Sequence, residues 1–233
     1  MNPEIIYSDC DIVVINKPPG MAAHGGFSVS GETVADFLRE KFPEIASVGD
    51  DPTIRPGIVH RLDKETSGVM VIARNQKSFD TLKKMFQERR MEKTYRAIVC
   101  GRMKTGKGII SLPLGRLAKN PLKRGAERGK TRIRGSREAI TEYRVMRAGD
   151  MFSLVEARPK TGRMHQIRVH MKELGHPIAC DKMYGGKNVC CPSDATRFLL
   201  HAQSLSFSFP EGTKRVFEAD PPEDFLLAEK MIL

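Results

Sequence analysis

The most informative polar residues of this chain lie between two apolar runs. His60, Arg61 and Asp63 follow the apolar pair Ile58–Val59, and a longer apolar run occupies positions 69–72. Because both flanking runs belong in a core, we expect Asp63 at the core boundary, partly desolvated. Burial disfavours a charged carboxylate, whereas a nearby arginine favours it. A carboxylate held ionised in this way is suited to nucleophilic or base catalysis, so Asp63 is a candidate catalytic residue.

Turn formation is an alternative explanation of the same segment. Asp63, Thr66 and Ser67 are residue types that hydrogen-bond to nearby backbone groups and stabilise turns without any catalytic role. His60 has no neighbouring Ser or Cys that it could activate, so a catalytic triad is not indicated. The residues by themselves leave both explanations of Asp63 open.

Positive charge is the strongest signal in the composition. The chain has 39 Lys and Arg against 28 Asp and Glu, a net charge of +11 and a pI near 9.6. Such an excess attracts polyanions, so nucleic acid is the expected partner. A basic surface with no specific partner is the alternative. Trp is absent and aromatic residues make up only 6%, which argues against a broad stacking platform for single strands.

Much of this charge is concentrated in residues 115–137, where Glu127 is the only acidic residue. The cations are Arg116, Lys119, Lys123, Arg124, Arg128, Lys130, Arg132, Arg134 and Arg137. A solvated charged segment is one interpretation. Nine cations would repel one another unless a polyanion screened them, so phosphate contacts are favoured. Lys123, Arg124, Lys130 and Arg132 are the candidate phosphate contacts in this segment.

The cysteines and the apolar runs indicate the compartment. The five cysteines are Cys10, Cys100, Cys180, Cys190 and Cys191. Their number is odd and no pair has C-x-x-C spacing, so we expect reduced thiols and no metal site, with a zinc site at His176 or Cys180 as the alternative. We therefore expect a reducing compartment, most simply the cytoplasm. Neither a membrane span nor a signal peptide is indicated.

Apolar periodicity predicts mixed secondary structure. Strands are expected at 12–16, 68–73, 94–100 and 198–209, with a hairpin from 140–147 and 151–157. Helices are expected at 33–42, from Ser78 as its cap, at 162–174 and after 221–222. Residues 106–137 are broken by Gly and Pro and predict a loop or irregular hairpin. The fold class is therefore α+β, with a largely antiparallel central sheet flanked by helices, in a single domain over residues 1–233.

Five segments together closely resemble the motifs of the RluA-type pseudouridine synthases. His60-Arg61-Leu62-Asp63 with Thr66-Ser67-Gly68 resembles the catalytic motif, and His60 favours the RluA-type branch. The other matching segments are residues 11–21 with His24, Glu92-Lys93-Thr94-Tyr95-Arg96-Ala97, residues 161–170, and Leu200-His201-Ala202. The resemblance covers nearly the whole chain and implies an isomerase of the EC 5.4.99 class that converts uridine to pseudouridine in structured RNA, with its active site in a cleft of the pseudouridine synthase fold.

The resemblance also implies a role for each matched residue. Asp63 is the essential carboxylate, acting either as nucleophile or as base. Tyr95 packs against the target uracil, although a core tyrosine is the alternative. Arg168 is the ion-pair partner of Asp63. Its position at the edge of the apolar face of its helix requires either a buried anion or a snorkelling side chain. The candidate RNA-contacting residues are Arg61, which would enter the base stack, His60, for which a structural role is the alternative, Arg163 and His165.

The expected partner is a stem-loop of ribosomal or transfer RNA, and rRNA or tRNA processing is the expected role. No cofactor and no metal are expected, nor an N-terminal S4 domain, and a monomer is the simplest state. A non-catalytic RNA-binding protein and a hydrolase using Asp63 with Glu65 are the competing hypotheses. Neither the target uridine nor the chemical route of Asp63 follows from the sequence.

Overall fold

The computed structural model describes residues 2–26, 31–104, 106–128, 133–209 and 212–232. The chain forms two compact units. Unit 1 comprises Met1–Glu92 and Ala202–Pro221, and unit 2 comprises Lys93–His201 and Pro222–Leu233. The expectation of one catalytic domain over residues 1–233 stays a prediction.

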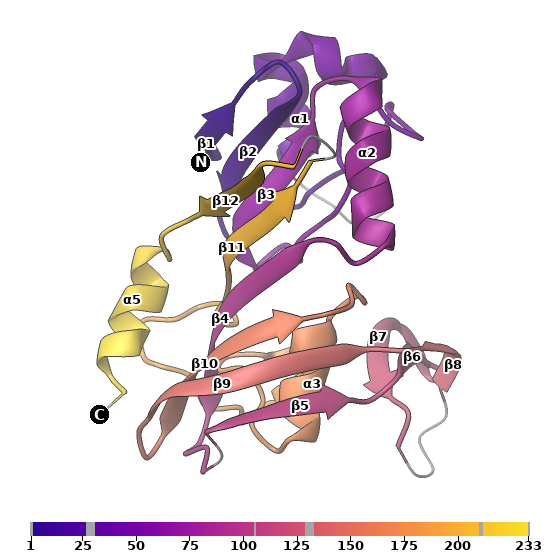
Figure 1. The fold of residues 1–233 in the computed structure, drawn as a ribbon. Coiled ribbons are helices and arrows are strands. Elements are labelled where there is room, and N and C mark those ends of the chain that lie inside the picture. The colour runs from indigo at the N-terminus through magenta and orange to yellow at the C-terminus, as the bar shows by residue number, and fades with distance from the viewer. Residues whose placement is uncertain (1, 27–30, 105, 129–132, 210–211, 233) are drawn as a thin grey trace. The chain divides into compact units, whose positions relative to one another are not determined.

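Unit 1 is a sheet with helices packed beside it (Figure 1). In hydrogen-bonding order its strands are β1 (Glu4–Ser8), β2 (Ile12–Lys17), β3 (Ser67–Ala73), β11 (Leu200–Ser208) and β12 (Lys214–Glu218). Its helices are α1 (Val34–Lys41), the short 3-10 helix η1 (Pro43–Ser47) and α2 (Gln76–Gln87). The pairs β1–β2, β2–β3 and β11–β12 are antiparallel. β3 is buried along its whole length, as its unbroken apolar run predicted.

The helix starts of unit 1 follow from their capping residues. Thr33 caps α1 in a reciprocal capping box with Asp36, in agreement with the predicted start. The prediction that Ser78 caps α2 is wrong. Asn75 is the cap, and its side-chain oxygen accepts the Ser78 backbone N–H at 2.9 Å, so the helix begins at Gln76.

Unit 2 contains a second antiparallel arrangement of strands. In hydrogen-bonding order they are β4 (Glu92–Cys100), β10 (Phe152–Pro159), β9 (Ile140–Ala148) and β5 (Lys107–Ser111). The helices are α3 (Gln166–Glu173), which packs against β9 and β10, the short α4 (Lys182–Gly185), and α5 (Glu223–Lys230) (Figure 1). The predicted β9–β10 hairpin and the C-terminal helix are confirmed. The fold class is α+β with largely antiparallel sheets, as predicted.

The prediction of a loop or irregular hairpin at 106–137 is wrong. Residues 107–111 form β5, and three further strands, β6 (Leu114–Leu117), β7 (Asn120–Ala126) and β8 (Ile133–Arg137), form a small sheet in the order β7-β6-β8. Leu114 and Ala126 pair across β6 and β7 and are buried with Val169 of α3, which gives this sheet an apolar anchor. We call this sheet the basic sheet because of its arginines.

The expectation of reduced thiols is wrong for four of the five cysteines. Cys100 is bonded to Cys190 and Cys180 to Cys191, with Cα–Cα separations of 5.7 and 4.6 Å. The chain segment before Cys180 runs beside the end of β4, because the Cys100 N–H donates to the carbonyl of Pro177. Pairs separated by 90 and 11 residues have no spacing pattern that sequence reasoning could use.

Within the part of the chain that the structure describes, no helix has both the length and the apolar character needed to cross a membrane.

Candidate active site

The turn that carries Asp63 is anchored in the core of unit 1 on both sides. Ile58 and Leu62 before Asp63 and Thr66 after it are buried, and Ile58 bridges to Ile72 of β3. The Thr66 N–H donates to the Asp63 carbonyl at 3.0 Å and closes the turn. Arg61 is exposed, and Asp63 is only half-buried. The predicted place of Asp63 at the core boundary is confirmed.

A fully buried lysine, Lys17, connects this turn to residues 17–21, the end of the first matched segment. The Lys17 ammonium donates to the carbonyls of Pro18 and Met21, each at 2.8 Å, and to the carbonyl of Lys64 at 3.0 Å. The Gly20 N–H also donates to the Lys64 carbonyl, at 3.0 Å. Because a buried ammonium must be compensated by hydrogen bonds, Lys17 holds the residue next to Asp63 at a fixed place. Nothing in the residue pattern alone indicated this role of Lys17.

His60 and Arg61 have different surroundings. The His60 ring stacks on Phe86 of α2 with centroids 4.6 Å apart, and its Nε2 accepts the Val71 backbone N–H at 3.1 Å. These contacts give His60 a packing role, and the prediction that it contacts RNA is untested. Arg61 donates to Nε2 of His24 at 3.2 Å, and the other ring nitrogen of His24 contacts the Gly25 carbonyl. This contact brings His24, the histidine matched with the first segment, to the turn that carries Asp63.

Tyr95 lies on β4 in unit 2, opposite Ala157 of β10. It packs on the core cluster that includes Val155 and Ile167 but is only partly buried. Lys93 lies two residues earlier, so its side chain points to the same face of the strand. Its ammonium donates to the Thr161 carbonyl at 3.1 Å, and burial lowers the pKa of Lys93 to about 8.

Arg168 is buried on α3 and has the anion that its position requires. Its Nε and Nη2 donate to the two carboxylate oxygens of Asp181 at 2.7 and 3.0 Å. The guanidinium lies 4.1 Å from the ring centroid of Phe198 and 5.0 Å from that of Tyr184. Asp181 was not among the predicted site residues. These are not all the interactions of Arg168, and its predicted pairing with Asp63, which lies in unit 1, stays a prediction.

Arg163 and His165 precede α3 instead of lying within it, so the predicted helix start at Gly162 is wrong. His165 has a left-handed backbone with φ of 59°, and the helix begins at Gln166. The buried Gln166 side chain accepts the Arg163 N–H at 3.0 Å and the Thr161 hydroxyl at 2.6 Å. These bonds fold residues 161–165, which precede α3, into a tight loop. Arg163 Nε also donates to the Glu138 carbonyl.

The basic sheet is connected to this loop through Tyr184 of α4. The Tyr184 hydroxyl accepts the Arg124 N–H at 3.0 Å and lies 2.6 Å from Nδ1 of His165. The Lys123 ammonium donates to the Met183 carbonyl at 2.9 Å. The other two candidate contacts of this segment, Lys130 and Arg132, lie outside the described residues.

Metal-binding geometry is not found in the described part of the chain. No three His, Cys, Asp or Glu side chains gather there in a way that could hold a metal ion.

Comparisons with known proteins identify the family. The model of the RNA pseudouridylate synthase family matches residues 11–173. An uncharacterized RNA pseudouridine synthase of Aquifex aeolicus is 39% identical over 95% of this chain and 70% of its own length. The ribosomal large subunit pseudouridine synthase D of Borreliella burgdorferi is 35% identical over 96% of this chain and 66% of its own length. The chain thus spans about two thirds of these relatives.

A solved structure agrees with this result. Human RNA pseudouridylate synthase domain containing 1 superposes with a TM-score of 0.76 at 28% identity, covering 97% of this chain and 86% of that one. The chain belongs to the RNA pseudouridylate synthase family, a family of isomerases, and within it to the RluA type.

Proposed function

We propose that this chain is an RNA pseudouridine synthase that isomerises a specific uridine in a stem-loop of large-subunit ribosomal RNA. The observation that carries the proposal is the half-buried Asp63, in a turn fixed by the buried Lys17, in a chain of this family. The choice of RNA is supported by the relatives from Borreliella burgdorferi and Neisseria meningitidis, whose names specify the large ribosomal subunit.

The reaction needs one ionised carboxylate beside the ribose. Asp63 either attacks C1′ or removes a ribose proton, and both routes break the bond between uracil N1 and C1′. The uracil then turns and its C5 bonds to C1′, the C5 proton leaves to solvent, and N1 takes up a proton. On the second route the ribose carbon also regains the proton that Asp63 removed. The product is an isomer of the substrate, so this scheme requires no redox partner and no group donor.

The remaining site residues act on the RNA or on Asp63 in this proposal. Tyr95 packs against the uracil, and Arg168 supplies a cation that favours the ionised carboxylate. The target nucleotide must leave the stack, which costs a few kcal/mol. Arg61 is exposed beside His24 and fills the resulting gap. The candidate phosphate contacts are Lys123, Arg124, Lys130, Arg132, Arg163 and His165.

Mapping the product on two classes of RNA tests the proposal. Unmodified large-subunit ribosomal RNA and unmodified bulk transfer RNA are each incubated with the protein. Pseudouridines are then located by carbodiimide labelling and primer extension. We expect new pseudouridine at one uridine, or very few, in a loop of the ribosomal RNA. Modification of transfer RNA alone would refute the ribosomal substrate, and modification of neither would favour an RNA-binding protein without this activity.

A further inference from the structure

The disulfide Cys180–Cys191 closes a short loop of unit 2, and its two ends differ in exposure. Cys191 is exposed, whereas Cys180 is buried. The other disulfide joins Cys100 and Cys190, which are both only partly exposed. A thiolate breaks a disulfide by direct attack on one of its sulfurs, so access decides which bridge reacts first. The bridge that ends at Cys191 is therefore the more open of the two to attack.

This bridge is directly next to a charged contact of the candidate site. Asp181 follows Cys180 in the chain, and its carboxylate accepts two hydrogen bonds from the Arg168 guanidinium at 2.7 and 3.0 Å. The same carboxylate caps α4, because it accepts the backbone N–H groups of Met183 at 3.2 Å and Tyr184 at 3.3 Å. A movement of Asp181 would therefore affect both the partner of Arg168 and the start of α4.

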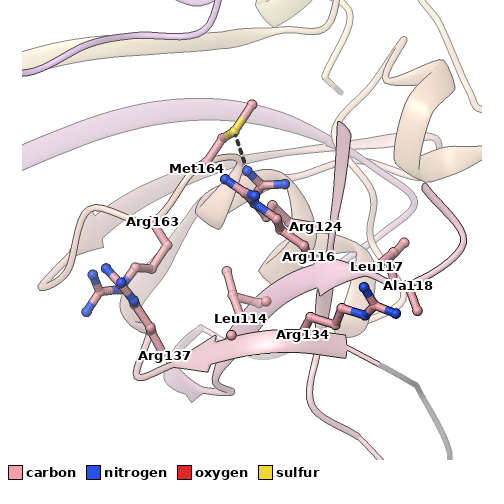
Figure 2. Close-up of a pocket in the computed structure, with 11 residues that line it drawn as sticks. Leu114, Arg116, Leu117, Ala118, Arg124, Arg134, Arg137, Arg163 and Met164 are labelled. Carbon is pink, nitrogen blue, oxygen red and sulfur yellow. Dashed lines mark hydrogen bonds between the residues drawn. The ribbon is translucent and has the colours of Figure 1, made fainter. Parts of the chain in front are cut away.

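Tyr184 extends this connection to the basic sheet. Its hydroxyl lies 2.6 Å from Nδ1 of His165 and accepts the backbone N–H of Arg124 at 3.0 Å. Arg124 lies in the wall of a pocket lined by five arginines, and its guanidinium donates to the sulfur of Met164 at 3.0 Å (Figure 2). A shift of α4 is thus transmitted to β7 and to the residues that precede α3.

The backbone of Cys180 lies in the left-handed region, with φ of 64°, which residues other than glycine rarely adopt. Such a conformation persists only where the surrounding structure enforces it. Two constraints act on Cys180 here. Its N–H donates to the Cys190 carbonyl at 2.8 Å, and its side chain is bonded to Cys191. Breaking the bridge removes the second constraint and lets Cys180 and the adjacent Asp181 leave this geometry.

We propose that Cys180–Cys191 is a thiol–disulfide exchange site through which a dithiol reductant lowers the activity of the enzyme. The proposal rests on the proposed function, because its output is the rate at which pseudouridine forms. One thiolate of the reductant attacks the Cys191 sulfur, the bond between the two cysteines breaks, and Cys180 leaves as a thiolate that takes up a proton. The second thiol of the reductant then releases Cys191 as a thiol. Two electrons and two protons pass to the protein, and the reductant becomes a disulfide.

The order in which the bridges open tests the site in the unaltered protein. The protein is equilibrated in graded mixtures of reduced and oxidised dithiothreitol, its thiols are alkylated with iodoacetamide, and the modified residues are located by mass spectrometry. We expect alkylation of Cys180 and Cys191 at a less reducing ratio than that of Cys100 and Cys190. Cys10, which is exposed and outside both bridges, should react throughout. Opening of both bridges together, or of Cys100–Cys190 first, would overturn the proposal.

Two double variants show which bridge controls activity. Cys100→Ser/Cys190→Ser keeps only the proposed site, and Cys180→Ser/Cys191→Ser keeps only the other bridge. We expect reduction to lower kcat of the wild type and of the first variant about tenfold, because small displacements near a reacting centre are costly. Oxidised dithiothreitol should restore both. The second variant should be slow in either state. Equal kcat of oxidised and reduced wild type, or a redox response of the second variant, would overturn the proposal.

Hydrogen exchange separates failure of this site from failure of the proposed function. Reduction should speed exchange of the backbone N–H groups of Tyr184 and Arg124, whose acceptors are the Asp181 carboxylate and the Tyr184 hydroxyl. If no pseudouridine forms in either state but these groups exchange faster after reduction, the redox response of α4 stands and the proposed function fails. If pseudouridine forms at one rate in both states, the proposed function stands and the exchange site fails.

Discussion

Two cations, Lys17 and Arg168, are buried at the two parts of the candidate site, and each is compensated in a different way. Lys17 gives its hydrogen bonds to backbone carbonyls, which ties a turn of the chain to the residue after Asp63. Arg168 is compensated by the carboxylate of Asp181 and by two aromatic rings. Buried charges of this kind tolerate the loss of a partner poorly, so they are suited to fixing geometry.

Removing the carboxylate of Asp181 should destabilise unit 2 strongly. Asp181→Ala leaves the Arg168 guanidinium buried without its bidentate partner, and we expect a loss of about 3–5 kcal/mol in the free energy of unfolding. Asp150→Ala is the matched control, because Asp150 pairs with Arg102 at the surface, where such pairs contribute at most about 1 kcal/mol. Urea unfolding measures both variants. Equal losses would show that Arg168 does not depend on Asp181.

The lowered pKa of Lys93 predicts that the stability of the protein depends on pH. Burial lowers its pKa from 10.5 to about 8, so between these values the unfolded chain binds more protons than the folded one. Stability should therefore rise with pH across this window through the contribution of Lys93. In Lys93→Met this contribution is absent. The difference in unfolding free energy between wild type and variant should shift in favour of the wild type from pH 8 to pH 10, and a constant difference would contradict the assignment.

At the scale of the elements, sequence patterns predicted the buried parts better than the exposed ones. The unbroken apolar runs of β2 and β3 and the alternation in β11 indicated strands correctly. The basic sheet was missed because its strands are short, rich in Gly and Arg, and held by few apolar residues such as Leu114 and Ala126. The sheet is stabilised by its packing on α3, and a long-range contact of this kind leaves no periodic pattern in the local sequence.

One disulfide joins residues 90 apart in sequence and the other residues only 11 apart, and removing the first should weaken unit 2. Cys100 ends β4, and Cys180 lies just before Asp181 at the start of α4. Replacing Cys100 and Cys190 by Ser should lower the free energy of unfolding by about 2–4 kcal/mol under oxidising conditions. Cys10→Ser is the control, because Cys10 is exposed and outside both bridges. Titration of five free thiols in the native protein would contradict the bridges.

For the whole molecule, the fold class and the family could be predicted from the sequence, whereas the interaction partners of individual side chains could not. Arg168 could be assigned a buried anion from its helical position, whereas Asp181 could not, because only the tertiary fold brings α4 to α3. The excess of positive charge predicted a polyanion partner, and the structure gathers part of it into one arginine pocket. The net charge thus predicts a class of ligand, whereas the place where the charge gathers depends on strand register.

The most direct test of the central claim is tritium release from ribosomal RNA labelled at uridine C5, compared between wild type and Asp63→Asn. The substitution keeps the size of the side chain and removes its charge, so RNA affinity and unfolding should be close to wild type while release falls to background. Asn cannot act as the carboxylate nucleophile or base that both routes require. Equal release by the two proteins would contradict the assignment of Asp63 and with it this account of the site.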